Sequence, residues 1–448
     1  MTGKRKRKLA MPDTLIIVAS VVLLVAILSW IIPSGTYDYQ EMNINGRIRN
    51  VAIDGTYHTI DKSEVTTTGF LGFFSVLYRG CVEAADVIFM ILCCCGTFGV
   101  VVKTGAFHAG IGTILKKLKG KEILLVPIIM MIFGLGGSVF GMASEFYGFY
   151  PLIVGLGVAL GYDAMFGFAI IAVGEFVGFM GATLNPYSVG IAQTISGVEL
   201  YSGTGYRAIC FVIFMAISII YVMVYGRKIK KNPGASVVFG EKNIHAFDRD
   251  ELNEYSFTLK DGLVLLDVLV VLVVLMLGLI KWGWDFPQLC GLFLLMSMIA
   301  AAICKWSPNK WCSEFIDSAK TAMWGCILTG IAKAITVVMQ DAQIMDTVIY
   351  GLSNVLKNAP HAVSAQVMLV VQTLINFFIP SATGQASATM PIMAQLADII
   401  GVSRQTAVLA FQFGDGLSNI FWPTADIVII CGLGGISLQK WYKWFTPL

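Results

Sequence analysis

The chain alternates between long apolar runs and short polar connections. A membrane-spanning helix needs about 20 predominantly apolar residues, and residues 13–32 form the first run of that length. The other apolar runs cover residues 83–104, 122–160, 164–198, 207–226, 262–281, 286–304, 321–340, 362–400 and 404–437. This pattern predicts an all-α polytopic membrane protein.

Two of the runs, 122–160 and 362–400, are about 39 residues long, and small residues interrupt each one near its middle. The interruptions read GLGGS at 134–138 and PSATGQ at 380–385. At 1.5 Å per residue each arm is only about 22 Å long, which is shorter than a hydrocarbon core of about 30 Å. We interpret both runs as re-entrant hairpins that enter and leave the membrane on one side. The alternative is a pair of short ordinary spans joined by a tight loop.

Charge changes this picture mainly through its position. Charged residues make up 13% of the chain and hydrophobic residues 56%, which excludes a disordered chain, a nucleic-acid binder and an ordinary soluble enzyme. Basic residues gather before the first run, between 103 and 121, between 227 and 231, and near the C-terminal end. The positive-inside rule assigns such clusters to the cytoplasm. We therefore expect a multi-pass protein of a prokaryotic inner (plasma) membrane, with its N-terminus cytoplasmic and the lipid bilayer as its surroundings.

The two halves of the chain resemble each other weakly at a nearly constant offset. A shift of 240 positions places Pro151 on Pro391 and Glu175 on Asp415. An amphipathic segment precedes the body of each half, and the charge pattern starts the first of these segments outside and the second inside. The sequence therefore predicts inverted repeats. Inverted repeats with interrupted helices are typical of secondary transporters, which bind substrate near the midplane.

The predicted organisation has three parts, which are a first repeat at 1–226, a cytoplasmic linker at 227–261 and a second repeat at 262–448. The first repeat holds an N-terminal span, an amphipathic helix at 70–81, a hairpin at 122–160 and a broken helix at 164–198. The second repeat holds a hairpin at 362–400 and a broken helix at 404–437. The first repeat ends with a span that the second lacks before Leu448, so we expect the native chain to continue into a further span.

Each broken helix carries a helix-breaking motif near its centre. The motifs are GATLNP at 181–186 and GDGLSN at 414–419, with Pro423-Thr424 just beyond the second. Proline removes a backbone donor and glycine lets the backbone open. Unwound backbone at membrane depth is tolerated where it is buried in protein or lines a cavity, and its carbonyls can coordinate Na⁺. The alternative is a proline kink whose freed groups are satisfied by neighbouring Ser or Thr.

Acidic residues lie inside several apolar runs, among them Glu145, Glu175 and Asp415. An ionisable group within the membrane is costly and usually marks a transport pathway. Acids at the proposed site favour a cationic substrate, Na⁺ or H⁺. The alternative is a set of ion-paired supports, for which the available partners are Lys320, Lys333 and Arg404. The four histidines form no catalytic motif, so we expect no enzyme, and paired hairpins suit alternating access better than a channel.

Two stretches resemble a known family. GATLNPYSVGIAQTISGVELYSGTGYR (181–207) and NFFIPSATGQASATMPIMAQLADIIGVSRQTAVLAFQFGDGLSNIFWPT (376–424) are similar to the YfcC-like carriers. These carriers are related to the anaerobic four-carbon dicarboxylate carriers and to arginine/ornithine antiporter-like proteins of the ion transporter superfamily. The resemblance runs along most of the chain from MPDTL at 11–15. It implies a homodimer with an elevator mechanism, in which the hairpins and broken helices slide against a scaffold.

In these relatives, Ser-Asn-Thr-type motifs at hairpin tips and helix breaks hold Na⁺ and a substrate carboxylate. Neither tip of this chain contains a literal Ser-Asn-Thr. The candidate substrate- and ion-binding residues are Ser138, Glu145, Glu175, Thr183, Asn185, Ser381, Thr383, Gly384, Gln385, Asp415, Ser418, Asn419 and Thr424. The candidate Na⁺ ligands are Thr183, Asn185, Ser418 and Asn419, and apart from Na⁺ or H⁺ coupling no cofactor is expected.

These observations together predict a secondary active transporter of small charged organic solutes. Exchange of basic amino acids of the arginine/ornithine type is the leading hypothesis, because acids are buried at the proposed site and because of the resemblance. The alternative is Na⁺- or H⁺-coupled transport of four-carbon dicarboxylates. Against that alternative, no arginine lies at either hairpin tip to clamp two carboxylates.

Overall fold

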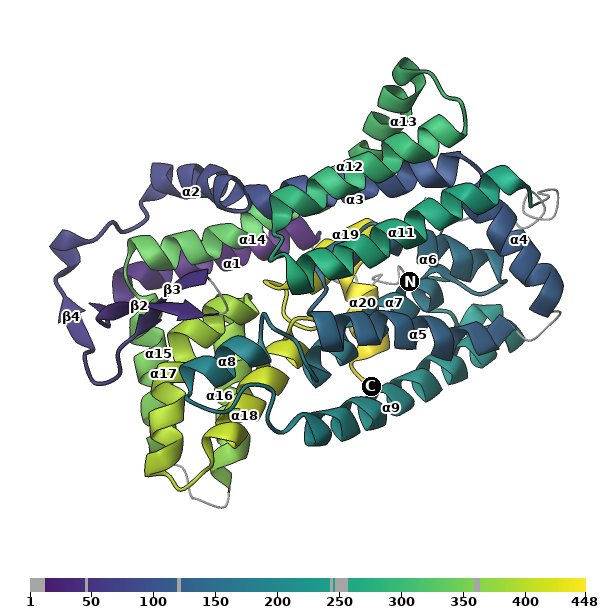
Figure 1. Ribbon diagram of the computed structural model, residues 1–448. Coiled ribbons are helices and arrows are strands. Elements are labelled where there is room, and N and C mark those ends of the chain that lie inside the picture. Colours follow the sequence, from purple (N-terminus) through teal and green to yellow (C-terminus); the bar gives the residue numbers. More distant parts are fainter. Residues whose placement is uncertain (1–12, 45–46, 119–121, 242–244, 246–256, 358–362) are drawn as a thin grey trace, which may run out of the picture.

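The computed structural model describes residues 13–44, 47–118, 122–241, 245, 257–357 and 363–448, and it is mostly helical (Figure 1). In this part of the chain, seven helices are long and apolar enough to cross a membrane. They are α1 (Thr14–Ile31), α3 (Ala85–Lys103), α7 (Ala164–Gly181), α9 (Thr204–Lys231), α11 (Leu259–Lys281), α12 (Phe286–Ile303) and α14 (Met323–Asp341). Each overlaps one of the predicted apolar runs, although α9, α11 and α14 extend beyond theirs. The prediction of a multi-pass helical membrane protein is therefore confirmed, with seven long apolar helices in the described residues where the sequence has ten apolar runs.

Some of the basic residues used to predict the orientation lie outside the described residues. These are the basic N-terminal cluster at 4–8 and the lysines at 119 and 121. Part of the predicted linker also lies there, at 242–244 and 246–256.

Local side chains set where several helices begin. The carboxylate of Asp13 accepts a hydrogen bond from the Leu15 N–H at 2.9 Å, and that of Asp163 accepts from the Phe166 N–H at 2.7 Å. Such caps satisfy backbone donors that have no partner within the first helical turn. The start of α7 is thus fixed by the sequence just before it.

Each predicted hairpin consists of two helical arms that are short or only just long enough to span. In the first, α5 (Leu125–Leu135) continues into the π-helical turn η3 (Gly136–Phe140), and α6 (Phe149–Ala159) returns. In the second, the arms are α16 (Ser364–Phe378) and α17 (Ala382–Ile399). At 1.5 Å per residue, α6 is about 16 Å long, against a hydrocarbon core of about 30 Å. The arm lengths agree with re-entrant hairpins, whose placement in a membrane stays a prediction.

Both predicted broken helices are interrupted, but the second interruption lies further along the chain than expected. The first separates α7 from α8 (Val189–Ile195), and the second separates α18 (Arg404–Ser418) from α19 (Asp426–Gly434). The unwound segment in the second half is thus 419–425, whereas the sequence indicated 414–419. Gly414 and Gly416 lie within α18, where they allow neighbouring helices to approach closely. A Cβ on Gly416 would lie 2.5 Å from the Cα of Met180. The helix is interrupted only where Pro423 follows.

The two amphipathic segments form helices that pack on the opposite half of the chain. Helix α2 (Phe70–Glu83) packs against α14, and α13 (Pro308–Lys320) packs against α3. Helix α1 also contacts α14, and α12 contacts α3. The contact between α2 and α14 depends on small residues, because a Cβ on Gly80 would lie 2.3 Å from the carbonyl oxygen of Gly330. The contacts of the first half are therefore mirrored by those of the second.

The polar segment after α1 forms strands, which the all-α prediction did not include. Antiparallel pairing joins β1 (Ser34–Thr36) to β4 (His58–Ile60) and β2 (Tyr39–Ile44) to β3 (Arg47–Ala52). The sequence between β2 and β3 is Asn-Gly, a dipeptide typical of tight hairpins. Figure 1 shows these strands beside α15 and α17. Asp346 ties the region to α15 by accepting hydrogen bonds from the Tyr39 hydroxyl (2.8 Å) and the Tyr37 N–H (3.0 Å).

Further short elements complete the described fold. Helices α4 and α15 were not predicted, since each lies in a connection between apolar runs. The remaining elements are α4 (Ala106–Leu118), α15 (Met345–Lys357), α20 (Leu438–Phe445), η1 (Lys62–Glu64), η2 (Glu122–Leu124), η4 (Ser144–Phe146) and η5 (Pro233–Ala235).

The broken helix of the first half is the most enclosed long helix. Within its membrane-length window, 94% of the residues of α7 are buried, compared with 22% for α9. Helix α7 contacts α5, α6, α9 and α18. A helix surrounded by protein in this way can end in an unwound segment without exposing backbone groups to lipid. The first break thus directly follows a helix that is enclosed by protein.

Candidate functional site

The first break is bound to the tip of the first hairpin. The Oγ of Ser138 and the Oγ1 of Thr183 lie 3.0 Å apart, and the Thr183 N–H donates to the Ser138 Oγ at 3.1 Å. The Leu184 N–H donates to the Ser138 carbonyl at 3.1 Å. Ala182, which ends α7, has a left-handed φ of 35°. The tip residue and the break residue that the sequence pointed to are therefore in direct contact.

Asn185 organises the rest of this break. Its Oδ1 accepts hydrogen bonds from the N–H groups of Tyr187 (2.9 Å) and Ser188 (3.2 Å). The side chain is fully buried, and its Nδ2 has no hydrogen-bond partner. Gly141, in the turn after η3, lies directly against it with φ of 69°. A Cβ at position 141 would lie 2.3 Å from the Asn185 Oδ1.

We expect Gly141→Ala to lower the free energy of unfolding by about 2 kcal/mol or more. The left-handed backbone alone costs an L-residue roughly 1–2 kcal/mol, and the new methyl group would displace Asn185 from its two backbone bonds. Thermal unfolding of the purified protein measures the effect. Gly205→Ala is the matched control, because a Cβ there meets nothing within 4 Å. Equal unfolding temperatures for the two variants would contradict this packing.

The tip of the second hairpin contacts the first break. Ser381 caps α17 by accepting from the Gly384 N–H at 3.3 Å, and the Thr383 hydroxyl donates to the Tyr187 carbonyl at 2.9 Å. Gln385 points inward instead, and its Nε2 donates to the Gln372 carbonyl at 2.9 Å. The second tip thus bridges two elements that lie almost 200 residues apart in the sequence.

The second break is held by an asparagine of the preceding hairpin arm. The Nδ2 of Asn376 donates to the Ser418 Oγ (2.7 Å), the Asn419 Oδ1 (2.8 Å) and the Asp415 carbonyl (3.2 Å). The Nδ2 of Asn419 donates to the Asp415 Oδ1 at 3.3 Å. Thr424, at the far end of the break, donates to the Phe377 carbonyl at 2.7 Å. Asp415 is fully buried, and its Oδ2 has no hydrogen-bond partner.

The helices that lead into the two breaks lie against each other in the fold. Gly416 of α18 packs against Met180 near the end of α7, and the Gln412 Nε2 donates to the Phe179 carbonyl at 2.8 Å. Helix α18 packs against both α7 and α8. The structure therefore brings together predicted residues from both tips and both breaks.

The other predicted acids belong to a neighbouring cluster. The Tyr150 hydroxyl donates to the Glu175 Oε2 at 2.7 Å, and the Tyr147 hydroxyl donates to the Asp426 Oδ1 at 3.1 Å. Glu145 is buried and accepts from the Ala143 N–H at 3.0 Å. These acids contact hydroxyl and backbone donors of the first hairpin, whereas Asp415 lies in the last turn of α18, just before the second break.

The suggested basic partners of these acids are engaged elsewhere. Lys320 pairs with Asp317 at 2.7 Å, and Arg404 pairs with Asp398 at 2.6 Å. Among the described residues, no Lys or Arg lies within ion-pair distance of Glu175 or Asp415. The alternative of ion-paired supports therefore loses two of its three candidate cations.

Comparison with known proteins identifies the family. The model of the C4-dicarboxylate anaerobic carrier family, DcuC, matches residues 11–448. A protein of Escherichia coli (strain K12) named "Putative basic amino acid antiporter YfcC" is 33% identical over 98% of this chain and 94% of its own. The chain belongs to the C4-dicarboxylate anaerobic carrier family. It is accordingly a multi-pass membrane transporter of a small solute rather than an enzyme, as the sequence predicted.

Other matches have the same extent. A protein of Haemophilus influenzae (strain ATCC 51907 / DSM 11121 / KW20 / Rd), described as uncharacterized, is 27% identical over all of this chain and 95% of its own. The YdaH transporter of Alcanivorax borkumensis is a solved structure that matches with a TM-score of 0.44 and 14% identity, over 97% of this chain and 95% of that one. MtrF of Neisseria gonorrhoeae matches with a TM-score of 0.43 and 15% identity, over 98% and 92%.

The candidate site also contains two residues that the sequence did not single out. Arg207, in the first turn of α9, is 1% exposed. Its guanidinium donates to the carbonyls of Ala182 (2.9 Å), Ser202 (2.8 Å) and Thr183 (3.1 Å). Asn376 is the other missed residue. An arginine at the start of an apolar helix and an asparagine within an apolar run were the available signals.

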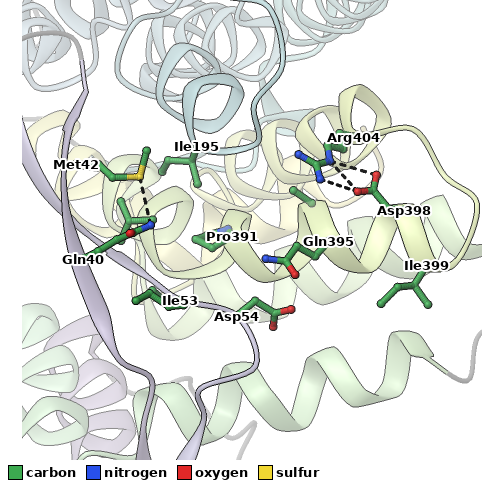
Figure 2. A pocket seen from close by; sticks show the side chains of 13 residues that line it. Gln40, Met42, Ile53, Asp54, Ile195, Pro391, Gln395, Asp398, Ile399 and Arg404 are labelled. Atoms are coloured by element: carbon green, nitrogen blue, oxygen red, sulfur yellow. Dashed lines mark hydrogen bonds and ion pairs between the residues drawn. The ribbon is translucent and has the colours of Figure 1, made fainter.

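One cavity of the carrier lies away from the breaks. It has a volume of about 490 Å³ and is lined by residues of β2, β3, the end of α8, α17 and the start of α18. Figure 2 shows Gln40 and Met42 on the strand side and the ion pair of Arg404 with Asp398 on the helix side. None of the predicted site residues lines it. The cavity therefore lies between the β2–β3 strand pair and α17, apart from the candidate site at the breaks.

A second cavity, of about 250 Å³, lies between α3, α6 and α13. His245 contributes to its wall beside Gly148 and Thr321. Burial lowers the pKa of His245 to about 4, so its ring is neutral at physiological pH. This cavity also lacks the residues of the two breaks.

Proposed function

We propose that this carrier is an antiporter that exchanges basic amino acids of the arginine and ornithine type. The observation that supports it most is Asp415, a fully buried carboxylate with one oxygen lacking a hydrogen-bond partner. A buried carboxylate without a cation is costly, and a substrate guanidinium or ammonium would neutralise it. The name of the Escherichia coli relative agrees with this substrate class.

The proposed binding site consists of both hairpin tips and both breaks. Carboxamide and hydroxyl groups at these positions offer short, fixed hydrogen bonds to a small polar solute. Glu145, Glu175 and the end of the second break at Thr424 lie beside this set, and we assign the two glutamates a role in proton or cation movement. The site residues are Ser138, Thr183, Asn185, Ser381, Thr383, Gly384, Gln385, Asp415, Ser418 and Asn419.

Alternating access is proposed to come from two inverted repeats. The order of elements from α2 to α8 recurs from α13 to α19, with two hairpin arms before each broken helix. The crossed packing of α2 on α14 and of α13 on α3 supports this symmetry. In an elevator mechanism, the hairpins and broken helices would move against α1, α2, α3, α12, α13 and α14. A homodimer would provide the fixed scaffold for that movement.

If the carrier couples transport to Na⁺, the second break is the better of the two candidate sites. The Asn419 Oδ1 and the unpaired Asn376 Oδ1 beside it are oxygen ligands of the kind that hard cations prefer. At the first break, the Thr183 carbonyl already accepts from Arg207, and the Asn185 Oδ1 accepts from two backbone N–H groups. We therefore assign a coupling ion to Ser418 and Asn419 before Thr183 and Asn185.

Dicarboxylate transport is the second candidate function. The family's name and the buried Arg207 next to the first break favour it. Against it, Arg207 already donates to three backbone carbonyls, which leaves few donors for a substrate carboxylate.

Transport in liposomes decides between the two functions. Purified protein is reconstituted into vesicles loaded with ornithine, with succinate or with buffer, and uptake of labelled arginine and labelled succinate is followed with and without an inward Na⁺ gradient. We expect rapid arginine uptake only into ornithine-loaded vesicles, because exchange needs an internal counter-substrate. Succinate uptake without arginine uptake would overturn the proposal and establish the dicarboxylate function.

A further inference from the structure

The two breaks differ in the kind of hydrogen-bonding group that they leave unpaired. At the first break, the Oδ1 of Asn185 accepts from two backbone N–H groups, which fixes the orientation of the amide. The Nδ2 is therefore the group without a partner, and it is buried. The Ser188 hydroxyl nearby is likewise buried and unpaired. The first break thus offers hydrogen-bond donors.

The second break offers acceptors. The Nδ2 of Asn376 donates to the backbone carbonyl of Asp415, and a carbonyl can only accept, so this amide is also fixed in orientation. Its unpaired atom is consequently Oδ1. The Asp415 Oδ2 is the second unpaired atom there, and both side chains are fully buried. A ligand at this break must supply N–H groups.

The formal charges near the two breaks also have opposite signs. The guanidinium of Arg207 touches the carbonyls of Ala182 and Thr183, which puts a buried positive charge behind the first break. The carboxylate of Asp415 puts a negative charge at the second. Coulomb interactions are strong where water is excluded. The charges therefore favour an anionic group at the first break and a cationic group at the second.

The elements that carry the two breaks contact each other. Thr383, at the second tip, donates to the Tyr187 carbonyl within the first break. Gly416, next to Asp415, packs against the backbone of Met180. The donor side and the acceptor side thus belong to elements that pack against each other.

We propose that the carrier binds its amino-acid substrate in a fixed direction, with the carboxylate on Asn185 and the guanidinium or ammonium end on Asp415. This inference rests on the proposed function and adds an orientation to it. It makes Asn185 the residue that distinguishes an amino acid from the amine that lacks the carboxylate. Agmatine, which is arginine without its carboxylate, is the matching probe.

Binding of arginine and agmatine to the purified full-length chain tests this orientation. A hydrogen bond to a charged group contributes roughly 1.5–3 kcal/mol, so wild type should bind arginine at least about tenfold more tightly than agmatine. In Asn185→Asp, the retained Oδ1 still accepts the two backbone bonds, and the new carboxylate oxygen repels the substrate carboxylate. This variant should weaken arginine at least about tenfold and leave agmatine affinity within about twofold.

Asn232→Asp, at an exposed position after α9, is the matched control and should change neither affinity. Equal loss of arginine and agmatine in Asn185→Asp, or an unchanged arginine affinity, would overturn the orientation while leaving the proposed function in place. Wild type binding agmatine as tightly as arginine would overturn it without any variant. Binding of succinate but not arginine by wild type would overturn the proposed function, and the orientation with it.

Discussion

Asp415→Asn is expected to reduce arginine exchange at least about 100-fold while the protein remains folded. Removing one partner of a buried ion pair costs roughly 3–5 kcal/mol, which exceeds a hundredfold change in affinity. In this case the partner left without its counter-charge is the substrate's cationic end. The amide has the shape of the carboxylate, and its oxygen can keep the hydrogen bond from Asn419, which is 3.3 Å in the native protein. The loss should therefore appear in transport and not in folding.

Exchange of labelled arginine against internal ornithine measures the effect, alongside thermal unfolding of the same preparation. Asp317→Asn is the matched control, since Asp317 lies on the exposed amphipathic helix α13 and pairs there with Lys320. The control should exchange at the wild-type rate. Exchange by Asp415→Asn at the wild-type rate, with unaltered coupling, would remove Asp415 from the site.

The long spans could be predicted from the sequence because hydropathy depends on composition over about 20 residues and little on the partners of each residue. The first break was predictable for a similar reason, since Pro186 and Gly181 act on their own backbone. The second break was misplaced because glycines at 414 and 416 serve close packing against α16 and α7. Whether a glycine opens a helix or lets a neighbour approach depends on contacts that the sequence does not display.

The candidate site was likewise predicted only in part. Residues such as Asp415 stood out because an acid in an apolar run is unusual. Arg207 and Asn376 did not stand out, although they organise the two breaks. Both donate hydrogen bonds to backbone carbonyls. Because every residue has a backbone carbonyl, the sequence contains no complementary side chain that would identify their partners. The strands after α1 were missed because the segment is polar and its order depends on Asp346, which lies over 300 residues away.

The second large effect concerns Arg207. We expect Arg207→Met to lower the free energy of unfolding by about 3 kcal/mol or more and to abolish arginine binding. Methionine is similar in length but donates no hydrogen bonds, so the Ala182 carbonyl loses its donor. The Thr183 carbonyl keeps only the Thr204 hydroxyl, and the Ser202 carbonyl keeps only the Gln193 and Gln405 amides. Each buried polar group left unsatisfied costs roughly 1–3 kcal/mol. The first break would then rearrange and take Asn185 with it.

Arg207→Lys separates charge from geometry. A lysine keeps the positive charge, but its single ammonium group cannot reproduce the planar fork that spans three carbonyls. We therefore expect Arg207→Lys to be destabilised nearly as much as Arg207→Met. Arg404→Met is the control, because Arg404 makes one hydrogen bond to a backbone carbonyl, that of Ser196, beside its exposed ion pair with Asp398, and such pairs contribute about 0–1 kcal/mol. If Arg207→Met unfolded at the temperature of the control, the Arg207 hydrogen bonds would not stabilise the first break. Another interaction would then have to explain why this break presents unpaired hydrogen-bond donors.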